Sequence, residues 1–460
     1  MLVAAAALIV LLVILYQFLV PDRGSDAVDS PTSPTPTPTE EPTTDLAVDW
    51  VLTPAEAAGA DDVEEFNTSP DGAFTGPRVI AGTEQWAMLT ESGEDTAEQV
   101  VGIDSGTGEV SWRHDVPDGL CGDAIVEGML ACLSHDGTGS PREGGWSGLV
   151  VDVATGEAQQ WEAPDVESAL VVHLTADGLL VVGDVAPHAP HAMVTLLSLD
   201  GEVRWQVDLA DIPAAEELFT DFVQTDVEGR SEGEQIMERP RWRDLDDGRV
   251  LLWSSPGAAL IEPASGEITA SACRRATAAG DHYFCATDDG VVRHGLDGSV
   301  EWTMPDLDLV SPPESTPARP LAVADQTQLM SADWTDGTEG QVQYRFRLSG
   351  GGFVSGTIPL RSGGSPEHTV AWGGDAMVGL EPEADQMLWS FDLTDAGPVS
   401  DVFAVDDILV TDSYPILGLD PATGEQLWSG RAEHGFAVEM VGDRLVSIGS
   451  DAIAPVVLPQ

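Results

Sequence analysis

The stretch GIDSGTGEVSW, at residues 102–112, decides the fold because the chain repeats it. The clearest further copies are VDVATGEAQQW at 151–161 and GLDPATGEQLW at 418–428. In each copy apolar residues lead into an Asp, and a Gly follows within a few positions. Asp at the start of a tight turn can bond to its own backbone, and Gly supplies the positive φ that closes the turn. Each copy therefore predicts a strand, a turn and a second strand that carries the tryptophan.

Weaker copies lie between the clear ones, at 197–205, 260–270, 294–302 and 379–389, with a degenerate copy at 346–356. The tryptophans that recur in the copies are Trp112, Trp161, Trp205, Trp302, Trp389 and Trp428. Over the seven intervals from the first to the last, the period averages about 45 residues, which is typical of a propeller blade. Since a Trp side chain buries a large apolar area, we expect each of these tryptophans to dock one blade on the next.

A hairpin is expected upstream of each turn, as at 169–184, where two apolar runs flank a short polar turn. A hairpin and a turn-linked strand pair make one four-stranded blade. Residues 436–459 resemble strands without such a turn, and LAVDWVL at 46–52 could complete their sheet and remove exposed edges. Nine blades would require every weak copy to be complete. Because the copy at 379–389 has few residues upstream, we expect an all-β propeller of eight blades over 46–460, with seven as an alternative.

Four cysteines form two local pairs, Cys121 with Cys132 and Cys273 with Cys285. Both pairs take the same place in a repeat, before the first strand of a blade and at the end of the second. A hairpin would bring each pair close across neighbouring strands. The even count and the local pairing predict two disulfides, as in proteins exported to an oxidising compartment.

The N-terminal segment predicts a membrane anchor. Residues 2–20 form an uncharged run of 19 residues, long enough to cross about 30 Å of hydrocarbon as a helix. No small-residue cleavage site or lipobox cysteine follows it, so we expect residues 1–20 to stay attached as a single-pass anchor. Residues 21–45, rich in Pro, Ser and Thr, predict a disordered, extended linker.

The orientation of this anchor follows from charge and cysteine usage. No basic residue precedes the apolar run and Arg23 follows it, so we expect a short basic segment upstream of Met1. The cysteine pairs and the acidic bulk place the propeller outside the cytoplasm, at the cell membrane.

The charge balance is strongly negative. The chain has 79 acidic and 19 basic residues, every basic one an Arg, and a formal net charge of -60. Because phosphates would be repelled, this charge argues against nucleic acid and anionic membrane surfaces as ligands. We expect a solvated acidic surface, with divalent-cation binding by some carboxylates as the alternative.

The pattern of GIDSGTGEVSW and GLDPATGEQLW resembles the PQQ (pyrroloquinoline quinone) repeat family over about residues 79–430. The resemblance implies a propeller of seven or eight blades. Its members include quinoprotein alcohol dehydrogenases, an outer-membrane assembly lipoprotein, and sensor domains of bacterial receptor kinases. The resemblance therefore implies a fold and leaves the activity open.

No catalytic site can be transferred from that family. Its dehydrogenases use a disulfide between adjacent cysteines over the quinone, and a calcium held by Glu and Asn. This sequence has no adjacent cysteines, and Asn67 is its only Asn. We expect no enzyme, no cofactor and no metal, with a PQQ- and calcium-dependent dehydrogenase as the alternative.

Two short motifs resemble metal sites. His188 and His191 lack a third ligand nearby, so we expect a solvated loop. Asp244, Asp246 and Asp247 lack the Glu that a calcium loop needs, so we expect a hairpin turn.

The longest insertion, at about 208–247, is the first candidate for a partner surface. It holds Arg239, Arg241, Trp242 and Arg243, and Arg and Trp are enriched at interaction hot spots. These arginines, like the pair at 274–275, could instead bind local carboxylates. We expect a protein-interaction or envelope-binding scaffold, with a sensing domain for a separate membrane signalling partner as the alternative.

Overall fold

The computed structural model describes residues 44–459, with gaps chiefly at 67–78, 136–144, 185–191, 213–240, 311–319 and 347–360 and shorter gaps elsewhere. The chain divides into two units, Met1–Pro36 and Thr37–Gln460, and all described residues belong to the second. The expected anchor and nearly all of the expected linker lie outside the described residues. No helix among the described residues is long and apolar enough to cross a membrane.

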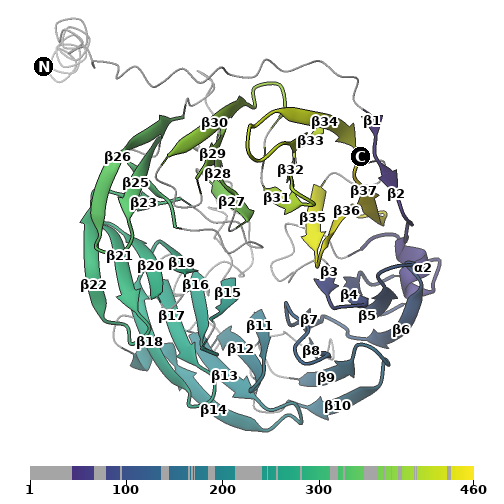
Figure 1. Cartoon of the computed structure of the whole chain (residues 1–460). Coiled ribbons are helices and arrows are strands. Elements are labelled where there is room, and N and C mark those ends of the chain that lie inside the picture. Colours follow the sequence, from purple (N-terminus) through teal and green to yellow (C-terminus); the bar gives the residue numbers. More distant parts are fainter. Residues whose placement is uncertain are drawn as a thin grey trace, which may run out of the picture. The chain divides into compact units, whose positions relative to one another are not determined.

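The strands form nine sheets that follow one another around a central axis (Figure 1). Blade 1 contains β3 (Val79–Ala81), β4 (Gln85–Thr90), β5 (Gln99–Asp104) and β6 (Val110–Asp115). Blade 2 contains β7 (Leu120–Cys121), β8 (Met129–His135), β9 (Trp146–Asp152) and β10 (Ala158–Glu162). Blade 3 contains β11 (Val171–Thr175), β12 (Gly178–Asp184), β13 (Ala192–Leu197) and β14 (Val203–Asp208), followed by the short helix η1 (Leu209–Asp211).

Blades 4 to 6 continue the same order. Blade 4 contains β15 (Arg241–Asp244), β16 (Val250–Ser254), β17 (Gly257–Glu262) and β18 (Glu267–Ala272). Blade 5 contains β19 (Arg275–Ala279), β20 (His282–Thr287), β21 (Gly290–Gly295) and β22 (Val300–Pro305). Blade 6 contains β23 (Asp308–Leu309), β24 (Ala322–Ala324), β25 (Gln328–Asp333) and β26 (Thr338–Arg345).

The last three blades complete the ring. Blade 7 contains β27 (Arg361–Ser365), β28 (His368–Gly373), β29 (Ala376–Leu380) and β30 (Met387–Asp392). Blade 8 contains β31 (Val402–Val405), β32 (Ile408–Thr411), β33 (Ile416–Leu419) and β34 (Gln426–Arg431), extended by β1 (Thr44–Asp45). Blade 9 contains β35 (Ala437–Val441), β36 (Arg444–Ile448) and β37 (Ile453–Val457), and its fourth strand is β2 (Ala47–Val48).

The propeller of four-stranded blades is confirmed, and the expected count of eight is wrong. The copy at 379–389 has a complete blade of its own, because the glycine-containing stretch at 361–373 forms β27 and β28. That stretch has an apolar run only in its second strand, β28, because β27 reads RSGGS. The degenerate copy at 346–356 was also misplaced: in blade 6 the turn between the third and fourth strands closes at Gly337, whose amide donates to the Asp333 carbonyl at 2.9 Å.

The N-terminal segment closes the ring, as the sequence predicts for residues 46–52. Within it, β2 pairs antiparallel with β37, and β1 pairs parallel with β34. The chain then forms helix α2 (Pro54–Ala58), whose carbonyls at 56 and 57 accept hydrogen bonds from the Arg113 guanidinium of blade 1. Closure by the chain's own start leaves no blade interface open.

Tryptophans dock the blades by a contact that repeats around the ring. Trp112 packs on Gly102 of its own blade, where a Cβ would lie 2.0 Å from the indole, and on the turn residue Gly156 of blade 2, where the distance would be 2.6 Å. Its Nε1 atom donates to the Val153 carbonyl in the same turn at 2.8 Å. The tryptophans that pack in this way against the turn glycine of the next blade are Trp112, Trp161, Trp205, Trp302 and Trp389.

Trp50 makes the same contact for blade 9. It packs against Gly108 in the turn of blade 1, and its Nε1 atom donates to the Ser105 carbonyl at 3.2 Å. The Arg444 guanidinium of blade 9 donates to the same carbonyl and pairs with Asp49. The ring is therefore closed by a docking tryptophan that the N-terminal segment supplies. Sequence reasoning placed this segment as a strand and overlooked its tryptophan.

The core is divided among the blade interfaces. In the described part of the chain, buried apolar side chains form nine clusters, and each cluster joins two neighbouring blades. One of them joins Val446 of blade 9 to Trp86 of blade 1 across the closure. Most of the apolar surface buried on folding thus lies between blades, so each blade depends on its two neighbours.

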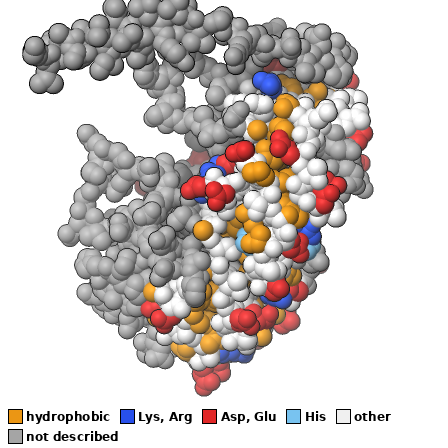
Figure 2. All heavy atoms as spheres, turned by 90° about the vertical axis from the view of Figure 1, so that its left-hand side faces the viewer, with side chains coloured by type: hydrophobic (Ala, Val, Ile, Leu, Met, Phe, Trp, Pro, Cys, Tyr) orange, Lys and Arg blue, Asp and Glu red, His pale blue; other side chains and the backbone are white. Residues whose placement is uncertain are grey.

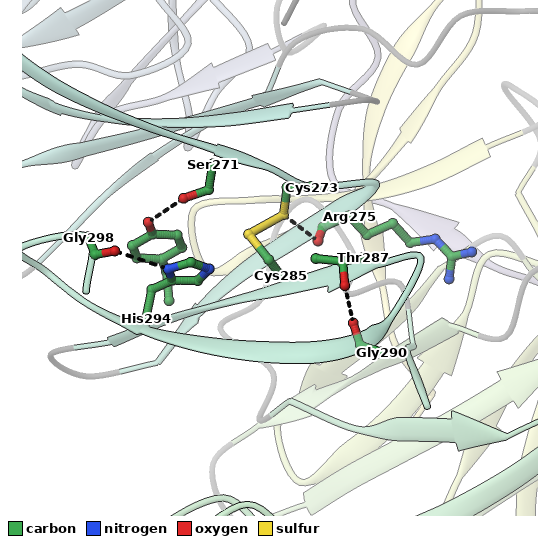
Figure 3. The surroundings of a disulfide bond; sticks show 9 residues. Ser271, Cys273, Arg275, Cys285, Thr287, Gly290, His294 and Gly298 are labelled. Carbon is green, nitrogen blue, oxygen red and sulfur yellow. Dashed lines mark hydrogen bonds between the residues drawn. A yellow bond between two sulfur atoms is a disulfide. The ribbon is translucent and has the colours of Figure 1, made fainter. Parts of the chain in front are cut away.

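Both expected disulfides are present. Cys121 in β7 is bonded to Cys132, its partner across the ladder in β8, with Cα atoms 3.9 Å apart. Cys273, just before β19, is bonded to Cys285 in β20, with Cα atoms 5.2 Å apart (Figure 3). Each disulfide therefore staples the first two strands of a blade, in blades 2 and 5.

Trp50→Ala should lower the free energy of unfolding by roughly 3 kcal/mol, because it removes the indole that docks blade 9 on blade 1. Thermal or denaturant unfolding of the full chain measures the change. Val51→Ala is the matched control: its side chain is 38% exposed, and we expect a change within about 0.5 kcal/mol. Equal stability of the two variants would show that Trp50 does not hold the closure.

Removing either disulfide should cost roughly 3 kcal/mol, since each closes a short loop, with sequence separations of 11 and 12. The paired substitutions Cys121→Ser with Cys132→Ser, and Cys273→Ser with Cys285→Ser, should both lower the melting temperature. Peptide mapping of the unreduced full chain should recover the two linked peptide pairs. Recovery of free thiols or of crossed pairs would contradict the pairing.

Candidate functional site

An ion-paired histidine joins the inner sides of blades 2, 3 and 4. His173 lies in β11, Asp123 follows β7, and Asp244 ends β15. The His173 Nδ1 atom lies 2.6 Å from Asp123 Oδ1, and its Nε2 atom lies 2.8 Å from Asp244 Oδ1. The strands β7, β11 and β15 are the ones nearest the axis in their blades (Figure 1), so we call these three residues the inner clamp.

The geometry of the inner clamp fixes the charge of the His173 imidazole. An ionised carboxylate only accepts hydrogen bonds, so both ring nitrogens must donate and the ring is an imidazolium. Burial of His173, which is 3% exposed, disfavours the charged form, yet Asp123 and Asp244 outweigh burial and raise the pKa of His173 to about 9. The two carboxylates are 30% and 57% exposed, so the negative ends of the clamp reach solvent.

Trp242 covers the clamp from blade 4. Its indole is stacked on the His173 ring, with centroids 5.3 Å apart and planes 14° apart, an arrangement that favours a cation. The sequence predicted a loop here, but the structure places residues 241–244 in β15. Trp242 is half-buried and packs in the cluster between blades 3 and 4, because its strand is the innermost of its blade.

The other residues of the expected partner surface are only partly described. Arg239 and the side chain of Arg241 lie outside the described residues. Arg243 is half-buried in β15. The expected hairpin turn after β15 is present: the Leu245 amide donates to the Arg249 carbonyl at 2.8 Å. His188, His191 and Asp246 lie outside the described residues.

Described arginines hold the propeller together. Arg274 and Arg275 both approach the Asp308 carboxylate at 3.4 Å, as expected if they bind local carboxylates. The arginines that donate to a backbone carbonyl are Arg113, Arg249, Arg274, Arg275, Arg293 and Arg444. These six described arginines thus bind the protein's own backbone.

Exposed glutamates repeat on one face of the ring. Every blade has the same strand order, so the turns between third and fourth strands lie on the same face, which we call the turn face. In five blades the turn glycine has a positive φ and is followed by an exposed Glu. These turn glutamates are Glu109, Glu157, Glu202, Glu267 and Glu425. They belong to blades 1, 2, 3, 4 and 8.

The outer side of the ring is also acidic. Figure 2 views the ring from the side of blades 5 and 6, and shows carboxylates spread over the surface with fewer basic side chains between them. Isolated apolar side chains are exposed there, including Val300 at 61%. Single exposed apolar residues are common on soluble proteins. The acidic turn face therefore continues an acidic outer surface.

The described residues contain no group of three or more His, Cys, Asp or Glu side chains placed to hold a metal ion. The inner clamp itself uses both nitrogens of its histidine for hydrogen bonds to carboxylates. A metal would have to replace the proton on one of them.

Sequence reasoning missed the inner clamp. Its only signal is a histidine inside the apolar run VVHLT of β11, and a single buried His carries little information about its partners. Asp244 drew attention only as part of a calcium-like motif. The turn glutamates could have been found, because Gly-Glu stands at the same place in five copies of the repeat.

A family model described as "Outer membrane protein assembly factor BamB" matches residues 52–231. A search of the curated proteins finds no match. Among solved structures, BamB from Moraxella catarrhalis is similar, with 14% identity, a TM-score of 0.44, and coverage of 90% of this chain and 98% of that chain.

A quinohemoprotein alcohol dehydrogenase from Comamonas testosteroni is similar too, with 11% identity, a TM-score of 0.46, and coverage of 91% of this chain and 78% of that chain. Likenesses at this level carry no argument about function. The recurring turn-and-tryptophan copies, the four-stranded blades and the match over residues 52–231 lead to one conclusion. Residues 52–231 match the family, and the described chain has the fold of a PQQ-repeat β-propeller.

Proposed function

We propose that this propeller is a membrane-anchored, extracytoplasmic scaffold that binds a basic protein or envelope component and performs no catalysis. The observation that carries the proposal is the ring of exposed turn glutamates at one position of five blades. Negative charge repeated over one face attracts and orients a positively charged partner. The formal net charge of -60 leaves this field largely uncompensated.

The proposed location rests on two features of the chain. Two disulfides staple blades 2 and 5, and such bonds persist in oxidising compartments outside the cytoplasm. The uncharged run at 2–20 is long enough for a membrane anchor, and the linker after it would hold the propeller away from the bilayer.

The proposed lack of catalysis rests on the sequence. The family's dehydrogenases hold their quinone and calcium with adjacent cysteines and an Asn, and this chain has neither adjacent cysteines nor an Asn other than Asn67. BamB, the protein named by the matching family model, is an outer membrane protein assembly factor. An interaction role is therefore in keeping with the family.

The test is site-specific photo-crosslinking of the full-length chain in its own membrane. Crosslinking residues replace Glu109 and Glu267 on the turn face. Val342, exposed on an outer strand away from these turns, serves as the control. We expect adducts with a basic protein at the first two positions and none at the control. Adducts only at Val342 would overturn the proposed surface.

Replacing all five turn glutamates by Gln should weaken partner binding by roughly an order of magnitude, because it removes the repeated charge. Folding should be unaffected, since the five side chains are exposed. A matched control removes the same number of charges outside these turns by replacing with Asn the exposed residues Asp118, Asp211, Asp306, Asp395 and Asp451. Equal loss in both variants would show a dependence on total charge and not on the turn face.

A parallel titration tests the absence of catalysis. The full chain is titrated with PQQ in calcium-containing buffer, and dye reduction is measured with simple alcohols and aldose sugars. We expect neither tight binding nor turnover. Tight binding with turnover would make the chain a quinoprotein dehydrogenase and would refute the scaffold.

A further inference from the structure

We propose that the inner clamp is a proton-dependent latch, in which one proton on His173 holds blades 2, 3 and 4 together at the axis. Each blade contributes one member: Asp123, His173 and Asp244. The His173 imidazole donates hydrogen bonds to blades 2 and 4 at once only while both of its nitrogens carry hydrogen. This inference concerns the control of the fold and does not depend on the proposed partner.

The charge of the His173 imidazole is controlled by neighbouring carboxylates. Among the described residues, Asp123 and Asp244 face it from blades 2 and 4 and raise its pKa. Within blade 3, His173 lies opposite Leu180 of β12, and on the blade 4 side the neutral indole of Trp242 is stacked on it. The state of the latch therefore depends on one histidine and two carboxylates.

Loss of the proton breaks one of the two bonds. A neutral ring donates from one nitrogen and presents a lone pair at the other, so one carboxylate would face an acceptor. The carboxylate that loses its hydrogen bond would turn toward solvent. Asp244 is 57% exposed and Asp123 is 30% exposed, so Asp244 can turn to solvent more easily. We therefore expect the contact between blades 3 and 4 to open first.

The direction of the pH dependence follows from the pKa of His173. Its folded value of about 9 lies above the ordinary value of 6.5. The stabilisation is thus complete below pH 6.5 and is lost as the pH rises through 9. The latch is closed at neutral pH and opens under alkaline conditions.

The experiment follows the full chain in detergent micelles from pH 6 to pH 10.5. Histidine-selective ¹⁵N labelling reports which ring nitrogens are protonated, and His173→Gln identifies the signal of His173 among the nine histidines of the chain. We expect His173 to be doubly protonated at pH 7.5. A neutral His173 at that pH would overturn the proposal.

Thermal unfolding over the same pH range tests the link to stability. The wild type should lose melting temperature between pH 6.5 and pH 9, and His173→Gln should lack that decline. Asp244→Asn, a conservative change at an exposed position, should move the His173 titration down by about one pH unit or more, because one carboxylate is lost. A decline with the same midpoint in all three proteins would refute the latch.

His294→Gln is the matched control. His294 is also buried and is stacked on Tyr283, with centroids 4.7 Å apart, but it lies in blade 5 and burial lowers its pKa. Its contribution to stability is therefore lost toward acidic pH. The alkaline decline should be unchanged in this variant, and a variant that abolished it would argue against a role specific to His173.

Discussion

The fold depends on an indole packed against the turn glycine of the next blade and, in three blades, also against a glycine of its own blade. At Trp112 the two contacts leave no room for a Cβ on either Gly102 or Gly156. The indole nitrogen then donates to the residue that follows the acidic start of that turn, as it does for Trp205 and Trp389. Since each blade buries its apolar surface against its neighbours, this contact sets the spacing of the blades that it joins.

That contact also explains which parts of the fold the sequence could predict. The glycine, the acidic residue and the tryptophan of one copy lie within about a dozen residues, so the repeat can be recognised in the sequence. The hairpin of each blade can then be located upstream of its copy. Blade 6 has no docking tryptophan at this position, and its turn at 334–337 was missed for that reason. The count of blades was one too low for a different reason: the copy at 379–389 was judged incomplete, whereas residues 361–392 form a whole blade. The closing strand was recognised.

The inner clamp could not be predicted, because its members are far apart and occur once. His173 is 50 residues from Asp123 and 71 from Asp244, and nothing local in the sequence connects them. The turn glutamates differ: they follow the turn glycine in five copies, so the repeat that builds the fold also distributes the charge of one face.

The two kinds of contact between blades have different physical consequences. Toward the outer side, an apolar indole with a neutral hydrogen bond is insensitive to pH, and it recurs from blade to blade. At the axis, blades 2, 3 and 4 are joined by a buried imidazolium between two carboxylates, which is favourable only while all three groups keep their charges. Because the outer contacts persist when that proton leaves, deprotonation would loosen the inner side of three blades without dismantling the ring. A closed ring with an inner contact that depends on a single histidine proton can therefore respond locally and still keep its turn face intact.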